Sequence, residues 1–191
     1  MNFFSSKHLK EQSDEQLMAA LAKGSRPAFE TLYDRYFAKL VWYARGFVLD
    51  TQKAEDVVQE VFMRIIDRPE AFSTERKFST WIYTVTGNSC RNILRNEQNR
   101  ERVLRDHIAP LEPKTTTLRS PDQKKLQVSI KKVLEGLSEK ERNIYSLRFE
   151  HELSIREISD IAGIPEGSVK SGIFYLLKKL AVQLKDFSYE Q

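Results

Sequence analysis

The side chains of this sequence that could carry acid–base or nucleophilic chemistry are a pair of carboxylates and a single thiol. Asp56 and Glu60 are four residues apart, which places both carboxylates on one face of a helix, as a general acid–base pair requires. No nucleophile, metal-ligand set or pocket motif accompanies them, so a solvated polar face is the simpler interpretation. The single cysteine, Cys90, excludes an internal disulfide and is typical of a small core residue.

Histidines and phosphate-binding loops give no further catalytic candidate. His8, His107 and His151 are far apart in the sequence. The run "EHE" at residues 150–152 could in principle hold a metal ion, but a solvated helix end is the favoured interpretation. The sequence has no glycine-rich phosphate loop. We therefore expect no catalytic residue, no metal site and no cofactor.

A tight turn between two short amphipathic helices is predicted within residues 154–180. Gly163 can supply a left-handed end to the first helix, and Pro165 blocks its continuation. Gly167 would then let the chain turn into Ser168, a good N-cap for the second helix. This chemistry predicts a helix-turn-helix, and a plain helical hairpin in a small bundle is the alternative.

The second helix, from Ser168, has an apolar side and a polar side. Apolar residues at helical spacing are expected to be buried: Val169, Ile173, Leu176, Leu177, Leu180 and Leu184. No acidic residue occurs from Ser168 to Lys185, and two aromatic rings are expected to face outward beside a lysine. Positive charge at a helix N-terminus suits a phosphate-rich partner. The candidate DNA contacts are Ser168, Lys170, Ser171, Phe174, Tyr175, Lys178 and Lys179.

Aromatic rings alternate with cations in a second segment. Phe78, Trp81 and Tyr83 follow directly on Arg76 and Lys77. Rings stack on unpaired bases while cations hold the nucleic-acid backbone, so this pattern suits melted DNA. Core packing is the alternative for Trp81, because Trp81 and Tyr83 would point to different faces of a helix.

The helix predicted to follow this segment has one packing side and one basic side. Its apolar residues are Ile93, Leu94, Val103 and Leu104, and its arginines are Arg91, Arg95, Arg102 and Arg105. The guanidinium groups are therefore expected to face an external partner.

The segment "AEDVVQEVFMRI" is predicted to be a helix with a polar outer face. Its buried stripe consists of Val58, Val61, Phe62 and Ile65. Asp56, Gln59 and Glu60 then lie on the opposite face, within about 100° of one another.

The chain is expected to be all-α, with two small helical domains joined by a flexible linker. Three prolines and three consecutive threonines in residues 106–121 prevent a continuous helix. About four helices are expected before this linker and another four after it. Capping boxes predict helix starts after Ser13, Ser138 and Ser154.

Composition places the chain among globular proteins that remain in the cytoplasm. Hydrophobic residues make up 40% and charged residues 30%, and the net charge of +4 suits an anionic partner only where the cations cluster. Neither a signal peptide nor the ~20 apolar residues of a membrane span is present.

The order of these segments resembles the extracytoplasmic-function class of bacterial RNA polymerase sigma factors, from about residue 28 to 184. Residues 29–37, "FETLYDRYF", are similar to the first conserved helix of the promoter-melting domain, and residues 54–65 to its polymerase-binding helix. Residues 78–95 resemble the part that recognises and opens the downstream promoter element. Residues 137–180 resemble the domain that reads the upstream element.

The resemblance implies an alternative sigma factor without catalytic activity of its own, bound to core RNA polymerase and promoter DNA. It implies sigma region 2 in residues 1–105, a linker in 106–121 and sigma region 4 in 122–191. Core polymerase would bind Asp56, Gln59 and Glu60. Downstream-promoter contacts would come from Lys77, Phe78, Ser79, Thr80, Trp81, Asn88, Arg91, Asn92 and Arg95. We expect a monomer without membrane insertion, and the resemblance also suggests an anti-sigma partner that no residue identifies.

Two positions depart from the usual pattern of that class. Gly172 stands where members usually carry arginine, which removes a phosphate or base contact and adds flexibility. Gly172→Arg is therefore expected to tighten DNA binding. Asn92 stands where aspartate is common, so a typical promoter preference cannot be assumed.

Two other functions fit parts of the sequence. A helix-turn-helix repressor or activator with an N-terminal sensing or dimerisation domain would bind palindromic sites as a dimer. A helical adaptor that binds only proteins would lack salt-dependent DNA affinity.

Overall fold

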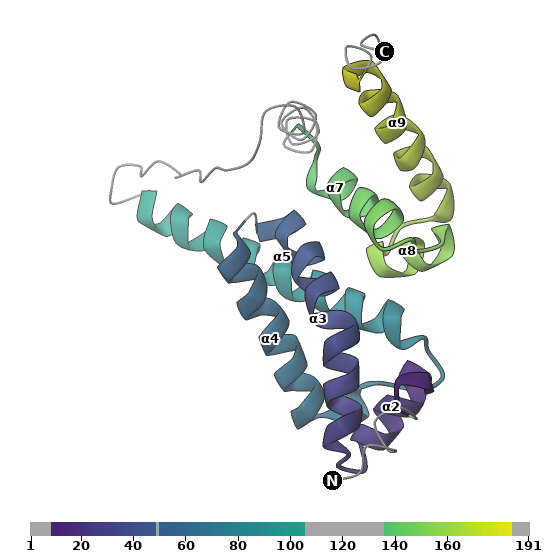
Figure 1. Cartoon of the computed structure of the whole chain (residues 1–191). Coiled ribbons are helices and arrows are strands. Elements are labelled where there is room, and N and C mark those ends of the chain that lie inside the picture. Colours follow the sequence, from purple (N-terminus) through teal and green to yellow (C-terminus); the bar gives the residue numbers. More distant parts are fainter. Residues whose placement is uncertain (1–8, 49, 106–135, 185–191) are drawn as a thin grey trace, which may run out of the picture.

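A computed structural model describes residues 9–48, 50–105 and 136–184, and the side chains of these residues except 100–105, 183 and 184. Every regular element in these ranges is helical, as the sequence predicts. The predicted linker, residues 106–121, and the expected start of the second domain near Asp122 lie outside the described residues. Figure 1 shows an N-terminal bundle and, beside it, a smaller C-terminal group of helices.

The N-terminal bundle is built around one long helix, α3 (Arg26–Val48). It packs against α2 (Asp14–Leu21), α4 (Thr51–Asp67) and α5 (Phe78–Arg105), and a short 3-10 turn, η1 (Pro69–Ala71), follows α4. Leu32, Leu40 and Tyr43 on the inner faces of α3 are almost completely buried. Burial of this apolar surface is the main stabilising contribution to the bundle.

Polar side chains join α2 to its neighbours. Arg35 Nη1 donates to Asp14 Oδ1 at 2.6 Å, and the hydroxyl of Tyr36 donates to the other oxygen of the same carboxylate. The backbone N–H of Phe78 donates to Glu15 Oε1 at 3.0 Å. The first turn of α5 is therefore capped by a side chain from α2, which satisfies an N–H group that has no partner within its own helix.

The C-terminal domain consists of α7 (Glu139–Tyr145), a π-helical turn η2 (Ser146–Glu150), α8 (Ile155–Ala162) and α9 (Glu166–Leu184). All three capping boxes predicted from sequence are present, with Ser13, Ser138 and Ser154 as N-caps. Gly163 ends α8 with φ 65°, the left-handed conformation that glycine adopts without strain.

The turn before α9 differs from the sequence-based prediction. The helix begins at Glu166, directly after Pro165, so Ser168 is its third residue and not its N-cap. Gly167 accordingly lies inside the helix. Proline favours this earlier start because its φ is close to the helical value and the first N–H groups of a helix need no intrahelical partner.

Burial along α9 follows the predicted stripe with one exception. Val169 and Leu176 are fully buried, Ile173 and Leu180 are partly buried, and the side chain of Leu184 lies outside the described residues. Leu177 was expected to be buried but is 48% exposed, because it lies at the margin of the stripe.

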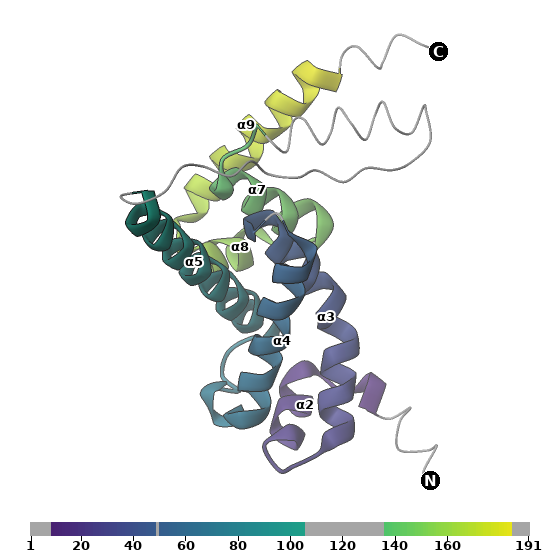
Figure 2. The same ribbon diagram turned by 90° about the vertical axis from the view of Figure 1, so that its left-hand side faces the viewer.

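The C-terminal domain packs on α3 and α5 of the N-terminal bundle. In both views α8 lies between α9 and the bundle (Figures 1 and 2), and α5 contacts α8 while α3 contacts α7. Buried residues of the two domains form one continuous apolar cluster, which includes Tyr83 on α5 and Leu147 and Ile158 of the C-terminal domain.

Candidate nucleic-acid and polymerase interfaces

The outer face of α9 carries exposed aromatic rings and cations, as predicted. Phe174 is 64% exposed and Tyr175 is 60% exposed, and their rings pack edge to face with centroids 5.6 Å apart. Lys170, Ser171 and Lys178 are also exposed. Large apolar rings left in water between lysines are typical of a surface that binds a partner, because aromatic side chains gain most when they are desolvated on binding.

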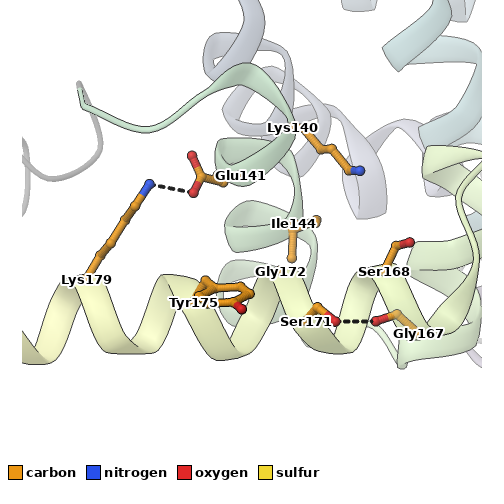
Figure 3. Close-up of a pocket in the computed structure, with 9 residues that line it drawn as sticks. All are labelled: Lys140, Glu141, Ile144, Gly167, Ser168, Ser171, Gly172, Tyr175 and Lys179. Carbon is orange, nitrogen blue, oxygen red and sulfur yellow. Dashed lines mark hydrogen bonds and ion pairs between the residues drawn. The ribbon is translucent and has the colours of Figure 1, made fainter.

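Lys179 and Ser168 lie on a different side of α9, toward α7. Lys179 Nζ pairs with Glu141 Oε1 at 2.5 Å, and this hydrogen bond, with those from Ser138, lowers the pKa of Glu141 to about 2. Ser168 is partly buried on the same side. These two side chains therefore contribute to packing between α7 and α9, and Ser171 and Tyr175 line a cavity toward α7 while remaining exposed (Figure 3).

This cavity, of about 530 Å³, lies between α7 and α9, and Gly172 is one of the residues that line it (Figure 3). The side chain of Ile144 points from α7 toward Gly172, and a Cβ atom on Gly172 would lie only 2.8 Å from Ile144 Cδ1. Gly172 thus faces the neighbouring helix. The expectation that an arginine here would tighten DNA binding is not supported, because its side chain would enter the interface between the two helices.

The segment at the start of α5 divides into buried and accessible residues. Phe78 is fully buried, in contact with the rings of Tyr36 and Phe72, so stacking of this ring on a base does not fit the structure. Trp81 is partly buried against Phe72 and Phe78, which matches the core-packing alternative. Tyr83 is also buried.

Polar residues of this segment remain accessible. Lys77 is exposed, and Ser79 and Thr80 are partly exposed. The Lys77 ammonium forms an ion pair with Glu157 of α8, with Nζ and Oε1 2.9 Å apart. Lys77 is thus accessible to DNA only in competition with this carboxylate.

A row of asparagine and arginine side chains follows along α5. Arg91 Nη1 donates to Asn88 Oδ1 at 2.6 Å, and Arg95 Nη2 donates to Asn92 Oδ1 at 3.4 Å. The Arg91 guanidinium also lies over the ring of Phe47, 5.9 Å from its centroid. Amide and guanidinium groups held in this way can present donors and acceptors to base edges and phosphates. The side chains of Arg102 and Arg105 lie outside the described residues.

The polar face of α4 is exposed as predicted. Val58, Val61, Phe62 and Ile65 are buried, while Asp56, Gln59 and Glu60 are exposed on the other side of the helix. Asp56 Oδ1 accepts a hydrogen bond from Gln52 Nε2 at 3.3 Å, and Glu60 Oε1 pairs with Arg64 Nη2 at 2.5 Å.

Sequence reasoning missed two apolar residues on this face. Met63 is 56% exposed and Ile66 is 43% exposed, and they follow Gln59 at helical spacing. Their positions outside the buried stripe were a sufficient signal, but both residue types are usually assigned to the core.

The residues considered for nucleophilic or metal chemistry are buried or isolated. Burial raises the pKa of the Cys90 thiol to about 12, so the thiolate is strongly disfavoured. Burial, with a smaller effect of Lys39, lowers the pKa of His151 to about 4. Within the described ranges, no cluster of three His, Cys, Asp or Glu side chains could hold a metal ion.

Comparison with protein-family models identifies the two domains that carry these faces. Residues 32–100 match the model of sigma-70 region 2, and residues 133–181 match that of sigma-70 region 4. The chain belongs to the ECF class of RNA polymerase sigma factors. As an alternative sigma factor it binds core RNA polymerase and directs promoter-specific initiation of transcription.

Relatives of this sigma factor are similar over nearly their whole length. The ECF RNA polymerase sigma factor SigW of Bacillus subtilis is 28% identical over 180 residues, which cover 86% of this chain and 92% of SigW. The RNA polymerase sigma-H factor of Pseudomonas aeruginosa is 28% identical over 179 residues, which cover 87% of this chain and 91% of that protein.

Solved structures share the fold of this sigma factor. CnrH in complex with the cytosolic domain of CnrY superposes with a TM-score of 0.67 at 21% identity, covering 92% of this chain and 99% of CnrH. RpoE of Bartonella quintana, in complex with the anti-sigma factor NepR, gives a TM-score of 0.62 at 22% identity, covering 85% of this chain and 98% of RpoE. None of the helices described for this sigma factor is long and apolar enough to cross a membrane.

Proposed function

We propose that this sigma factor uses three separate faces for its three contacts during initiation. The exposed face of α4, with Asp56, Gln59 and Glu60, would dock on core polymerase. The start of α5 and its asparagine–arginine row would hold the downstream promoter element, and the outer face of α9 would read the upstream element. The observation that carries this proposal is the aromatic and cationic face of α9, on which Phe174, Tyr175 and Lys178 are exposed.

The residues assigned to each DNA face are those whose side chains are accessible. On α5 and just before it they are Lys77, Ser79, Thr80, Asn88, Arg91, Asn92 and Arg95, with the partly buried Trp81. On α9 they are Lys170, Ser171, Phe174, Tyr175 and Lys178. Cations supply most of the affinity, and aromatic and amide groups supply selectivity.

The wider organisation follows from the same proposal. Region 2 would occupy residues 1–105 and region 4 residues 122–191, with residues 106–121 as the linker. The protein would act in the cytoplasm as a monomeric initiation factor without enzymatic activity of its own. An anti-sigma partner is part of the proposal, because RpoE of Bartonella quintana was solved in complex with the anti-sigma factor NepR.

Run-off transcription with purified core polymerase over a genomic promoter library tests the function. We expect defined transcripts that appear only when the protein is added. Phe174→Ala with Tyr175→Ala should abolish most of them, because base and backbone contacts by α9 are lost. Leu177→Ala is the matched control, since Leu177 is exposed at the margin of the same helix. Transcripts that are insensitive to the aromatic pair would remove α9 from promoter recognition.

A further inference from the structure

The cavity of about 530 Å³ between α7 and α9 is open because α9 presents only small residues to it (Figure 3). Gly167, Ser168, Ser171 and Gly172 line it from α9, and none of them has a side chain larger than a hydroxymethyl group. A volume of this size lies within the range of ordinary ligand sites. The space can therefore receive a chemical group from outside the protein.

Charged side chains lie at the two ends of this cavity. In Figure 3, Lys179 turns toward Glu141 at one end, and Lys140 extends from α7 toward the end where Ser168 lies. Lys179 Nζ and Glu141 Oε1 are 2.5 Å apart, so these two charges compensate each other. Lys140 is exposed, and among the described residues no carboxylate pairs with it. One cation is thus left over at the end of the cavity near Ser168.

The charge balance of the lining favours an anion. Two lysines, Lys140 and Lys179, line the cavity, and Glu141 alone among its lining residues is acidic. The backbone N–H of Ser138 also donates to Glu141, at 2.9 Å, so this carboxylate is held by neighbours on both helices. An anion that enters the cavity would meet an available ammonium group and a carboxylate whose charge is already compensated.

The cavity is continuous with the outer face of α9. Ser171 and Tyr175 line the cavity and are also exposed on that face. An α-helix with its side chains is about 10–12 Å wide, and the major groove of B-DNA is about 12 Å wide. A helix that enters the groove therefore has a sugar–phosphate backbone along each of its flanks. One flank of α9 is this cavity, and α7 forms its far wall.

We propose that the cavity receives a backbone phosphate of the upstream promoter element, and that Lys140 of α7 holds this phosphate. The inference rests on the proposed role of α9 in DNA binding and extends that interface to a second helix. The hydroxyl groups of Ser168 and Tyr175 are further donors in the lining, whereas the Ser171 hydroxyl donates to the carbonyl oxygen of Gly167 at 2.9 Å. Such a contact adds affinity for DNA of any sequence and carries no base preference.

The salt dependence of promoter binding by the reconstituted holoenzyme measures this contact. Lys140→Met removes the ammonium group and keeps an unbranched side chain that helices accept. Loss of one phosphate contact should reduce the steepness of log affinity against log salt by about 1, and the affinity roughly three- to tenfold at about 0.1 M salt. Lys23→Met makes the same change in net charge at an exposed position just after α2 and should change neither quantity. An unchanged slope for Lys140→Met would overturn the proposal.

Gly167 permits an independent test from the α9 side of the cavity. No heavy atom comes within 4 Å of a Cβ atom added there, so a new side chain meets open space. Gly167→Glu adds a carboxylate to the lining, and Gly167→Gln is the neutral control of the same shape. An acidic residue in the first turn stabilises a helix, so the Glu variant should fold at least as well as the Gln variant.

We expect the holoenzyme to bind the promoter several-fold more weakly with Gly167→Glu than with Gly167→Gln, and the difference to shrink as salt is raised. Equal affinities of these two variants at low salt would overturn the presence of a phosphate in the cavity.

A free nucleotide offers the same phosphate chemistry as DNA and is distinguished by titrating the full chain alone. Inorganic phosphate and ADP are the probes, and amide NMR signals of α7 and α9 are the readout. We expect no saturation up to millimolar concentrations, because the contacts that α9 makes in the groove are then missing. Saturation at micromolar ADP that Lys140→Met abolishes would overturn DNA as the source of the phosphate.

Failure of this inference and failure of the proposed function give different results. If Phe174→Ala with Tyr175→Ala weakens promoter binding while Lys140→Met matches the parent, the phosphate contact alone is overturned. If neither variant changes the affinity for the promoter, the role of α9 itself is overturned.

Discussion

His151 is interpreted differently from the sequence and from the structure. In the sequence it stands between two glutamates, in a pattern that could hold a metal ion. In the structure its imidazole is packed on Tyr83 and its Nε2 has no partner. Burial disfavours the imidazolium, and the nearby Lys39 disfavours it further, so the pKa falls to about 4.

This burial predicts a loss of stability in mild acid. The unfolded chain binds a proton at His151 below its ordinary pKa of about 6.5, and the folded chain does so only near 4. Between these values the unfolded state binds more protons, so the free energy of unfolding falls as the pH falls. After discounting for partial exposure, we expect a loss of about 1–2 kcal/mol from His151.

Urea unfolding at about pH 7 and about pH 5 measures this loss, with His151→Gln as the comparison. The lowered pKa values of Glu141 and Glu157, both about 2, affect the parent and the variant alike. The variant should lose less stability than the parent over this range. Parallel losses in the two proteins would show that His151 is protonated equally in the folded and unfolded states.

At the scale of the helix, Gly172 affects how closely α7 and α9 pack. Mid-helix glycine lowers helix propensity, and the sequence alone presented Gly172 as a weak point and a lost DNA contact. In the structure Gly172 allows the terminal methyl group of Ile144 to approach α9 (Figure 3). Packing across the helix pair therefore opposes the propensity gain of any larger residue.

A double-mutant cycle tests this packing. Gly172→Ala should stabilise a bare helix by about 1 kcal/mol, but here the new Cβ meets Ile144 Cδ1, so we expect no gain or a net loss. Ile144→Val removes that methyl group and alone should lower stability by about 0.5–1.5 kcal/mol. In the Gly172→Ala background it should lower stability less, because it relieves the overlap. Additive effects in thermal or urea unfolding would contradict a close approach.

At the scale of the whole molecule, the proposed polymerase-binding face on α4 lies away from the contact between the two domains, which α3 and α5 make with α7 and α8. Helix α4 contacts α3 and α5 through its buried stripe, and its polar side faces solvent. The exposed Met63 and Ile66 add apolar area to the carboxylates of that side. A charged face with apolar residues among its carboxylates suits a protein–protein interface, where apolar contacts supply affinity and charges supply specificity.

Charge reversal on α4 is expected to uncouple folding from polymerase binding. Asp56→Lys with Glu60→Lys changes two exposed residues, so the thermal melt should stay close to the parent's, apart from the lost Glu60–Arg64 pair. Like charges at an interface cost several kcal/mol, so co-purification with core polymerase and promoter-dependent transcription should be lost.

The chain offers a close control for this variant. Glu30 and Asp34 are exposed on α3 at the same spacing, and Glu30 pairs with Arg26 as Glu60 pairs with Arg64. Glu30→Lys with Asp34→Lys should retain transcription. Normal transcription by the α4 variant, or equal loss in both variants, would remove the docking role from α4.

Much of this protein follows from its sequence because the signals are local. Capping boxes at Ser13, Ser138 and Ser154 depend on hydrogen bonds across three residues, and the buried stripe of α4 depends only on helical periodicity. The exposed rings of Phe174 and Tyr175 follow from the same periodicity. The family resemblance is also sequence information, because it depends on motifs in a fixed order.

Tertiary structure decided the features that depend on contacts between distant segments. The cap that Glu15 supplies to α5 joins residues 63 positions apart, and the ion pair between Lys77 and Glu157 joins residues 80 positions apart. The burial of Phe78 likewise depends on rings from other segments of the chain. Gly172 faces α7 because helix packing, and not propensity, fixes its environment. Periodicity predicts which side of a helix is buried, but it does not specify which neighbour covers that side, and that neighbour determines which charges and rings remain available to DNA.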